Sequence, residues 1–342
     1  MRTADLNKTA QTLVADGKGI LAADETVPTV TKRLGALMQS TPQSRRAYRE
    51  MFFTTPGISN FISGVIMQDE TIHQKNNDGV ALPDLLTHQG IISGIKVDNG
   101  AKPLAGSPAE HITEGLDGLR DRLSEYVKLG ARFAKWRAVI EIDRELPTPA
   151  CVHANAHALA RYAALCQEQD VVPIVEPEVL MDGSHTIERC EEVTGRVLHA
   201  VFDALFDKHV LLEGILLKPN MVISGRTCKR QADVREVATA TLRCLRRHVP
   251  AAVPGIVFLS GGQDHLLATA HLSEINRLEY SKPWPLSFSY GRALQDEALK
   301  AWRGKNENLK AGQLAFYHRA KCDSAAALGR YTPSMEREAL TA

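Results

Sequence analysis

Short apolar runs alternate with amphipathic segments along most of this chain. The first segment, residues 3–15, has the spacing of an amphipathic helix, with an apolar stripe that includes Leu6 and Leu13. Eight short apolar runs follow, and continuous apolar runs of this length are typical of strands buried on both faces. We therefore predict strands over residues 20–24, 61–68, 91–98, 133–140, 171–179, 211–220, 255–262 and 286–293.

Helical patterns separate most of these runs. The clearest cover residues 115–129, 152–167, 187–206, 232–247 and 266–278. Buried strands that alternate with helices predict a parallel sheet covered by helices, an α/β fold. Eight such units favour a (β/α)8 TIM barrel with extra N-terminal and C-terminal helices, and a doubly wound open sheet is the alternative. We see no change of composition that would mark a domain boundary.

Composition narrows the classes of function. The 342 residues include 41 basic and 40 acidic side chains, a net charge of +1, which argues against nucleic acid or a membrane surface as a partner. Apolar runs stay well short of the roughly 18 residues of a membrane span, and we expect no signal peptide. Six scattered cysteines without a C-x-x-C pair fit reduced thiols, so we expect a cytoplasmic protein.

Polar residues stand at the ends of seven of the eight predicted strands. The carboxyl ends of barrel strands are where functional residues meet. Residues two apart on a strand face the same way, so Lys135 should share a face with Arg137, and Glu176 with Glu178. Purely structural roles could explain polar residues at one or two strand ends, but they do not readily explain polar residues at seven of the eight. The full set is Asp24, Lys96, Lys135, Arg137, Glu176, Glu178, Lys218, Ser260, Gly261, Gly262, Ser289, Tyr290, Gly291 and Arg292.

Lys218 lies at the mouth of an apolar run that Pro219 should terminate. Burial and a like charge nearby both favour a neutral amine, so one of Lys218 and Lys135 can be a nucleophile while the other stays cationic. A neutral lysine adds to a ketone to give an iminium ion, and the proton transfers suit carboxyl groups such as Glu176 and Asp24. A lysine that reaches from a strand end into water is the alternative.

Two glycine-containing segments after predicted strands suggest phosphate binding. Residues 260–262, Ser-Gly-Gly, permit close backbone approach to an anion, and residues 289–292 add the guanidinium of Arg292. Each segment alone is also compatible with a plain turn. His153 and His157 lack the glutamate of the zinc-protease motif, and the other histidines show no metal-ligand spacing, so we expect neither a metal nor another cofactor.

At these residues the chain resembles the class I (Schiff-base) fructose-1,6-bisphosphate aldolases, from about the first helix to Thr332. The shared motifs include GKGILAADE (17–25), GIKVD (94–98), FAKWR (133–137), VPIVEPE (172–178), LLKPNMV (216–222), FLSGGQ (258–263) and SYGRAL (289–294). The resemblance implies a metal-independent lyase of glycolysis and gluconeogenesis, commonly a homotetramer. It also implies one barrel domain over 1–342, with an N-terminal helix (1–16), the barrel (17–303), and a C-terminal helix with a short mobile tail (304–342).

The resemblance also implies a role for each site residue. Lys218 is expected to form the Schiff base, Glu176 to act as the general acid/base, and Asp24 to act in carbon–carbon cleavage. Lys135 would support charge in the intermediates, and Glu178 would help position Lys218. The expected substrate-binding residues are Arg33, Thr26, Thr29, Lys96, Arg137, Ser260, Gly261, Gly262, Ser289, Gly291 and Arg292. Among these, Ser260, Gly261, Gly291 and Arg292 correspond to the site of the ketone-side phosphate.

Two departures from the family pattern bear on these expectations. After AADE the family usually has Ser-Thr-Gly-Ser, whereas this chain has Thr-Val-Pro-Thr at 26–29, and Pro28 stiffens that segment. A Schiff-base aldolase for sedoheptulose bisphosphate or a sugar monophosphate is therefore an alternative. Many relatives also end in a tyrosine that assists proton exchange, but the last tyrosine here is Tyr331. The enamine would then be protonated by Glu176, Tyr331, water or another group.

A third interpretation is a non-catalytic barrel that binds phosphorylated ligands or protein partners. Loss of the nucleophile, the acid or the base would be its signature. Lys218, Glu176 and Asp24 are all present, which argues against it.

Overall fold

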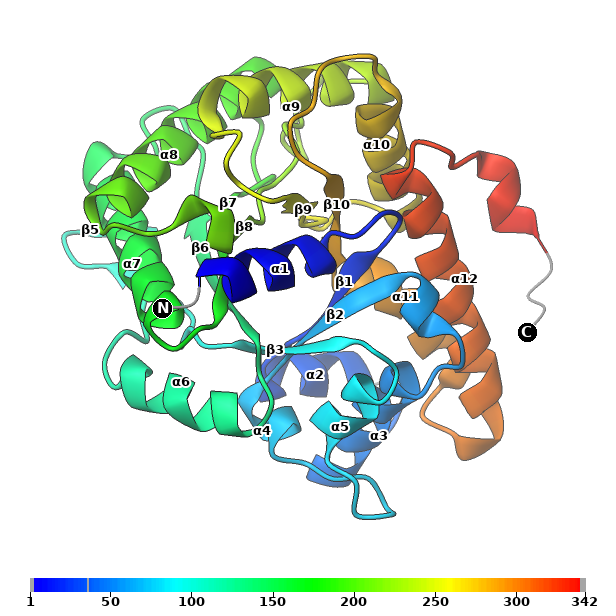
Figure 1. Cartoon of the computed structure of the whole chain (residues 1–342). Helices are drawn as coiled ribbons and strands as arrows, with labels where there is room; N and C mark the ends of the chain where they lie inside the picture. The colour runs from blue at the N-terminus through cyan, green and yellow to red at the C-terminus, as the bar shows by residue number, and fades with distance from the viewer. Residues whose placement is uncertain (1–2, 36, 339–342) are drawn as a thin grey trace.

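Eight parallel strands close into a barrel in a computed structural model that describes residues 3–35 and 37–338 (Figure 1). Going round the barrel, the strands are β1 (Gly19–Ala23), β10 (Leu286–Tyr290), β9 (Ile256–Phe258), β8 (Leu216–Leu217), β7 (Val172–Val179), β6 (Phe133–Ile140), β3 (Ile92–Lys96) and β2 (Ile62–Met67). Closure confirms the barrel and excludes the doubly wound open sheet.

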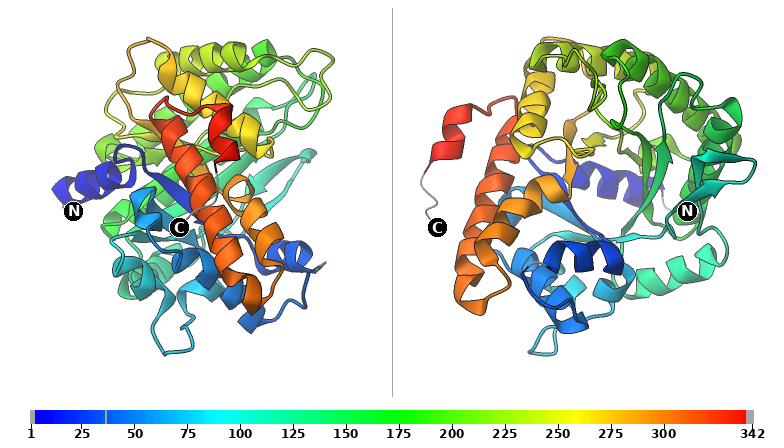
Figure 2. Two further views of the ribbon diagram at one scale, coloured as in Figure 1. Left: turned by 90° about the vertical axis from the view of Figure 1, so that its right-hand side faces the viewer. Right: turned by 180° about the vertical axis from the view of Figure 1, so that it is seen from behind.

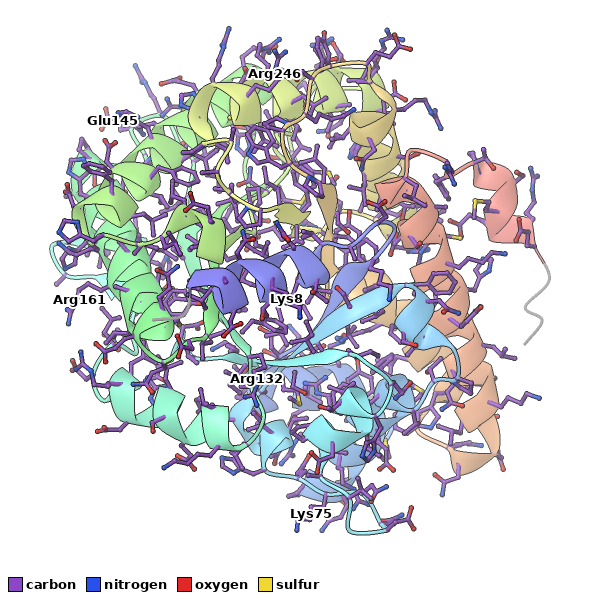
Figure 3. All side chains as sticks on the ribbon, in the orientation of Figure 1. Lys8, Lys75, Arg132, Glu145, Arg161 and Arg246 are labelled. Atoms are coloured by element: carbon purple, nitrogen blue, oxygen red, sulfur yellow. The ribbon has the colours of Figure 1, made fainter. Side chains whose placement is uncertain are left out.

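Helices form a ring around these strands (Figure 1). The longer ones are α3 (Pro42–Phe53), α6 (Leu119–Lys128), α7 (Pro149–Glu168), α8 (Ile187–Asp207), α9 (Val234–His248), α10 (His265–Arg277), α11 (Arg292–Trp302) and α12 (Leu309–Ala327). Three short ones are α2 (Val27–Leu34), α4 (Asp69–Ile72) and α5 (Leu82–Thr87). Charged side chains such as Lys75, Arg161 and Arg246 lie exposed at the outside of this ring (Figure 3).

The first helix, α1 (Thr3–Leu13), lies across one end of the barrel (Figure 1). Its apolar stripe joins side chains from inside the barrel, among them Phe133 and Val257, in one buried cluster. Gly64, near the start of β2, leaves the space that Leu13 fills, because a Cβ there would lie 2.5 Å from the leucine. α1 thereby covers the amino ends of the strands, which leaves their carboxyl ends open. Figure 2 shows that opposite end in its right-hand view.

Several predicted strands prove shorter than expected. The segment predicted as a strand over 211–220 begins with a 3-10 turn (Leu212–Gly214), and only Leu216–Leu217 pairs as β8. The segment predicted over 255–262 pairs only at Ile256–Phe258, and the last one stops at Tyr290 because α11 begins at Arg292. Lys218 and Ser260–Gly262 therefore belong to the loops that follow β8 and β9, and Arg292 belongs to α11, whereas Ser289 stays within β10.

Some elements have no counterpart in the predicted set. A two-stranded antiparallel hairpin, β4 (Ala101–Leu104) and β5 (Ser107–Thr113), follows β3. At the other end of the chain, Pro333–Arg337 forms a 3-10 helix beside α12 (Figure 2). Its Glu336 pairs with Arg319 at 2.8 Å. Residues 339–342 of the expected tail lie outside the described residues, and the domain boundaries stay a prediction.

None of the helices among the described residues is both long and apolar enough to cross a membrane. All six cysteines are free thiols.

Candidate active site

A cavity of about 360 Å³ opens at the carboxyl ends of the strands. Every residue that the sequence predicted for catalysis or substrate binding lines it. The lining also includes Ala22, Glu25, Leu180, Asp182, Arg226 and Leu259, which the sequence did not single out. The barrel therefore brings together side chains that are up to 268 positions apart, from Asp24 to Arg292.

Two lysines and two carboxylates form the buried floor of this cavity, here called the floor cluster (Asp24, Lys135, Glu176 and Lys218). Lys218 Nζ lies 3.2 Å from Glu176 Oε1, and the other oxygen of Glu176 lies 3.3 Å from Lys135 Nζ. Lys135 Nζ also contacts Asp24 Oδ2 at 2.7 Å. The side chains of both lysines and of Glu176 are only 4% exposed. The floor cluster is therefore largely shielded from bulk water.

Strand pairing explains how these residues meet. Lys135 and Arg137 lie two apart on β6, Glu176 and Glu178 lie two apart on β7, and Arg137 is paired in register with Glu176. Both pairs face the cavity, as the strand period predicts. The amide N–H of Lys218 donates to the carbonyl of Val175 at 2.8 Å, which holds Lys218 beside β7 just beyond the end of β8. This hydrogen bond fixes the backbone of Lys218 relative to β7.

Within the floor cluster, Asp24 and Lys135 shift each other's pKa. Burial alone would raise the pKa of Asp24, but the ammonium groups of Lys135 and the other cavity lysines lower it to about 2. Burial alone would lower the pKa of Lys135, but Asp24, Glu176 and Asp98 raise it well above its ordinary value. Lys135 is therefore a fixed cation at neutral pH, and Asp24 is a fixed anion.

Glu178 pairs with Arg137 rather than with Lys218. Its Oε2 lies 2.5 Å from Arg137 Nε, and this carboxylate keeps the pKa of the guanidinium raised although burial opposes it. Among the described residues, the ion pair of Lys218 is with Glu176 alone. Glu178 is therefore placed to orient Arg137, and its role in positioning Lys218 stays a prediction.

The loop after β9, the end of β10 and the start of α11 form one edge of the cavity mouth, here called the rim (Ser260–Gly262, Ser289, Gly291 and Arg292). Gly261 and Gly262 have φ of +60° and +82°, a left-handed backbone that favours glycine. Within the described residues, neither of their amide N–H groups has an acceptor. The Ser289 hydroxyl is buried and has no partner either. These donors are what an anion requires.

The basic residues of the cavity differ in whether a carboxylate already neutralises them. Lys96 contacts Asp98 at 2.7 Å, and Arg33 is held by Glu25 and by Asp296, the latter at 2.7 Å. Arg292 has no carboxylate partner within the described part of the chain. An unpaired guanidinium next to free N–H donors makes the rim the strongest anion site of the cavity.

The segment that departs from the family pattern begins a helix rather than a loop. Thr26 is the N-cap of α2, and Pro28 lies in the first turn, where a missing N–H costs nothing. The hydroxyls of Thr26 and Thr29 lie 3.1 Å apart at the cavity wall. The two hydroxyls expected for the aldehyde-side phosphate are therefore held close together, and Pro28 fixes the start of the helix that carries them.

Asp98 is a site residue that the sequence interpretation missed. Its carboxylate contacts Lys96 at 2.7 Å and Lys135 at 4.0 Å, and its side chain is 3% exposed. Asp98 lies two positions after Lys96, so the same-face rule applied to Lys135 and Arg137 would have identified it. Glu25 could be found only from the structure, because its partners Arg33 and Arg49 lie on α2 and α3.

Tyr331 does not line the cavity. Its side chain is buried beside the C-terminal 3-10 helix, where burial and the neighbouring Glu336 both raise the pKa of the phenol. The backbone carbonyl of Tyr331 accepts a hydrogen bond from Arg277 at 3.1 Å, which anchors this part of the chain to α10. This position removes Tyr331 from the groups that can reach a substrate in the cavity.

One group of metal-capable side chains exists among the described residues, away from the cavity lining. Ligand atoms of His318, Cys322 and Glu336 lie within 4.8 Å of one another. Glu336 is already held by Arg319 at 2.8 Å, so its carboxylate is neutralised by a guanidinium. The group serves to fasten the C-terminal 3-10 helix to α12.

A lysine that shares a buried carboxylate with a second lysine, beneath an anion-binding rim, suits an enzyme that forms imines with phosphorylated carbonyl compounds. A sequence model of the family described as fructose-bisphosphate aldolase class-I matches residues 5–342. The chain belongs to this family. Its members are lyases that act without a metal through a lysine Schiff base.

Individual relatives support the same family assignment. A probable fructose-bisphosphate aldolase class 1 of Xanthomonas axonopodis pv. citri is 56% identical, over 97% of this chain and 99% of the relative. A cytosolic fructose-bisphosphate aldolase of Arabidopsis thaliana is 52% identical over 97% and 84%. The solved structure of the Plasmodium falciparum aldolase, in complex with TRAP and a small-molecule inhibitor, is 49% identical with a TM-score of 0.95, covering 96% of both chains.

Proposed function

We propose that Lys218 carries the reaction of the family, the reversible cleavage of fructose 1,6-bisphosphate to dihydroxyacetone phosphate and glyceraldehyde 3-phosphate. The observation that supports this most directly is the bridging position of Glu176, 3.2 Å from Lys218 and 3.3 Å from Lys135. A carboxyl group between two amines can take the proton that one amine must lose and return it later in the cycle. The amine of Lys135 remains charged throughout the reaction.

The steps follow from these positions. Lys218 Nζ adds to the ketone carbon, and Glu176 supplies the proton with which the carbinolamine oxygen leaves as water, giving the iminium ion. The iminium draws the electron pair of the neighbouring carbon–carbon bond, so the bond breaks and an enamine forms on Lys218. Lys135, a fixed cation, stabilises negative charge that develops on substrate oxygens.

Asp24 would accept the proton of the hydroxyl that becomes the aldehyde. Its low pKa guarantees that the carboxylate is ionised at neutral pH but makes it a weak base. Proton transfer to Asp24 is therefore favourable only while the electron pair moves into the iminium. We propose that this dependence couples deprotonation of the hydroxyl to carbon–carbon cleavage.

The experiment that tests the proposal is borohydride reduction in the presence of dihydroxyacetone phosphate, followed by intact mass measurement and peptide mapping. We expect a stable adduct on Lys218 in the wild type and none in Lys218→Met. Lys229→Met, which removes an exposed lysine outside the cavity, is the matched control and should trap normally. Activity that survives Lys218→Met, or that requires a metal, would overturn the proposal and favour a metal enzyme, and the absence of both adduct and activity in the wild type would favour a binding protein.

A second candidate is a Schiff-base aldolase for another sugar phosphate. Thr26 and Thr29 stand at the start of α2 where the family usually has a Ser-Thr-Gly-Ser segment, and this wall faces the aldehyde end of the substrate. The ratio of kcat/KM for fructose 1,6-bisphosphate, sedoheptulose 1,7-bisphosphate and fructose 1-phosphate separates the two candidates. A preference for fructose 1,6-bisphosphate supports the first.

We further propose that the protein works in the cytoplasm as a homo-oligomer, a tetramer by resemblance. Six free thiols and a relative described as cytosolic support the compartment. Light scattering on the purified protein gives the subunit number, and a monomer would refute this part.

A further inference from the structure

Arg226 reaches the cavity from a loop that no motif in the sequence marked. The loop follows Lys218 and is fastened to the loop after β7 by three backbone hydrogen bonds of 2.7–2.9 Å between residues 225–227 and 181–185. The contact is so close that a Cβ at Gly225 would lie 2.5 Å from the carbonyl oxygen of Gly183. The backbone that carries Arg226 is therefore held in one place, although its side chain is about half exposed.

The guanidinium of Arg226 converges with that of Arg292 on the rim. A Cβ built on Gly262 would lie 3.1 Å from Nη2 of Arg226 and 3.2 Å from Nη2 of Arg292. Two guanidinium groups thus flank the same glycine, whose N–H has no acceptor in the described part of the chain. Among the residues that the structure describes, the one carboxylate paired with Arg226 is Asp182, at 3.5 Å, and both side chains are more than half exposed, so this pairing is weak.

Like charges in this arrangement repel each other, so an anion that lies between them is stabilised by both. A phosphate group offers three oxygens and about two negative charges, more than one guanidinium can satisfy. Arg292 lies at the start of α11 and Arg226 lies in the loop that follows Lys218, and the Nη2 atoms of both approach Gly262. The glycine N–H groups of residues 261 and 262 supply donors between them.

We propose that Arg226 is a specificity residue that binds the phosphate next to the ketone, together with Arg292, and sets the preference for phosphorylated over unphosphorylated ketones. The inference rests on the proposed function, because it assigns the rim to the ketone-side phosphate. The proposal also gives a role to the weak ion pair between Arg226 and Asp182. This pair holds Arg226 near the rim and breaks when phosphate binds.

Borohydride trapping on Lys218 tests this with two ketones that differ only in the phosphate. We compare half-saturation by dihydroxyacetone phosphate and by dihydroxyacetone in the wild type, Arg226→Ala, Arg226→Lys and Arg230→Ala. Arg230 lies in the same chain segment, is exposed, pairs with Glu236, and does not line the cavity. Arg230→Ala changes the net charge of the protein by the same amount as Arg226→Ala.

We expect Arg226→Ala to reduce the preference for dihydroxyacetone phosphate about 10-fold, as for the loss of one hydrogen bond to a charged group. Arg226→Lys should recover part of it, and Arg230→Ala should equal the wild type. An equal effect on both ketones, or equal effects of Arg226→Ala and Arg230→Ala, would overturn the inference while leaving Lys218 trapping intact. Absence of trapping in the wild type would instead overturn the proposed function itself.

The two ends of the substrate provide an independent check. If Arg226 binds the phosphate next to the ketone, Arg226→Ala should lower kcat/KM for fructose 1,6-bisphosphate and fructose 1-phosphate by the same factor. A loss confined to the bisphosphate would place Arg226 at the aldehyde-side phosphate and overturn the assignment.

Discussion

The floor cluster and the rim handle charge in opposite ways. On the floor, every charged group already has a partner, and the contacts of 2.7–3.3 Å join two lysines to two carboxylates. On the rim, Arg292 has no carboxylate partner among the described residues, and the glycine N–H groups are free. The floor is almost inaccessible to solvent, whereas Arg292 and Arg226 are exposed.

Desolvation explains this difference. An unpaired charge at the floor would cost several kcal/mol, so charges can be kept there only in matched pairs on strands that fix their geometry. At the rim, water hydrates an unpaired guanidinium at little cost, and the loops leave it free to meet an anion. The floor is therefore prepared for proton transfer before the substrate arrives, and the rim is completed only by the substrate.

The largest effect should come from breaking the bridge at the floor. Glu176→Gln keeps the size of the side chain but removes the group that exchanges protons with Lys218, and we expect kcat to fall about 10³-fold. Steady-state kinetics with fructose 1,6-bisphosphate measure this. Glu178→Gln, two residues along the same strand, should lose much less, since its partner is Arg137. Equal losses in the two variants would mean that the floor cluster is not the proton-transfer unit.

Asp24→Asn should reduce kcat about 10²-fold and also destabilise the fold. The pKa of Asp24 falls from 3.8 to about 2 in the folded protein, which corresponds to about 2 kcal/mol of stability. A carboxyl whose folded pKa is depressed contributes this stability above its unfolded pKa, near 4, and loses it as the pH falls through 2. At pH 7 the term is therefore fully present.

Urea unfolding of the wild type and Asp24→Asn at pH 7 and pH 3 measures this term. We expect a difference of about 2 kcal/mol at pH 7 and a smaller one at pH 3, because acidification removes the contribution from the wild type alone. A difference that grows on acidification would show that the pKa of Asp24 is raised, not lowered. The pairing of the floor before substrate binding would then be wrong.

Every member of the floor cluster and of the rim could be predicted from the sequence, but the strand period gives a physical reason only for the residues that lie on strands. Lys135, Arg137, Glu176 and Glu178 lie on β6 and β7, where the alternation of side chains determines which residues face the cavity. The same rule, applied to Lys96, would also have identified Asp98. The barrel itself follows from eight buried apolar runs separated by helices.

Loops have no such period, and the sequence gives little information about where they lead. Arg226 lies in a loop whose path depends on contacts with residues 181–185, which are about 40 positions away in sequence. The same holds for Glu25, whose partners lie on two helices, and for the hairpin of β4 and β5. The residues of Ser260–Gly262 were found through their glycines, but their free N–H groups could be recognised only from the fold.

At the rim, Arg292→Ala should raise KM for fructose 1,6-bisphosphate about 30-fold with a small change in kcat, because a charge-assisted contact to phosphate is lost in both ground and transition states. Lys300→Ala is the matched control, since Lys300 lies exposed on the same helix and pairs with Glu297 at the surface. A fall in kcat comparable to that of Glu176→Gln would show that rim and floor act as one unit.

Tyr331→Phe should have the smallest effect, because the phenol lies next to Glu336 and outside both the floor and the rim. We expect the rate of tritium exchange at the ketone-side carbon of dihydroxyacetone phosphate to stay within about 2-fold of the wild type, whereas Glu176→Gln should reduce it by the same factor as kcat. If Tyr331→Phe reduced exchange 10-fold or more, residues 331–338 would have to leave α12 and enter the cavity during turnover. The ion pair between Arg319 and Glu336 would then be a contact that breaks in each catalytic cycle, and Arg319→Gln would be expected to accelerate exchange.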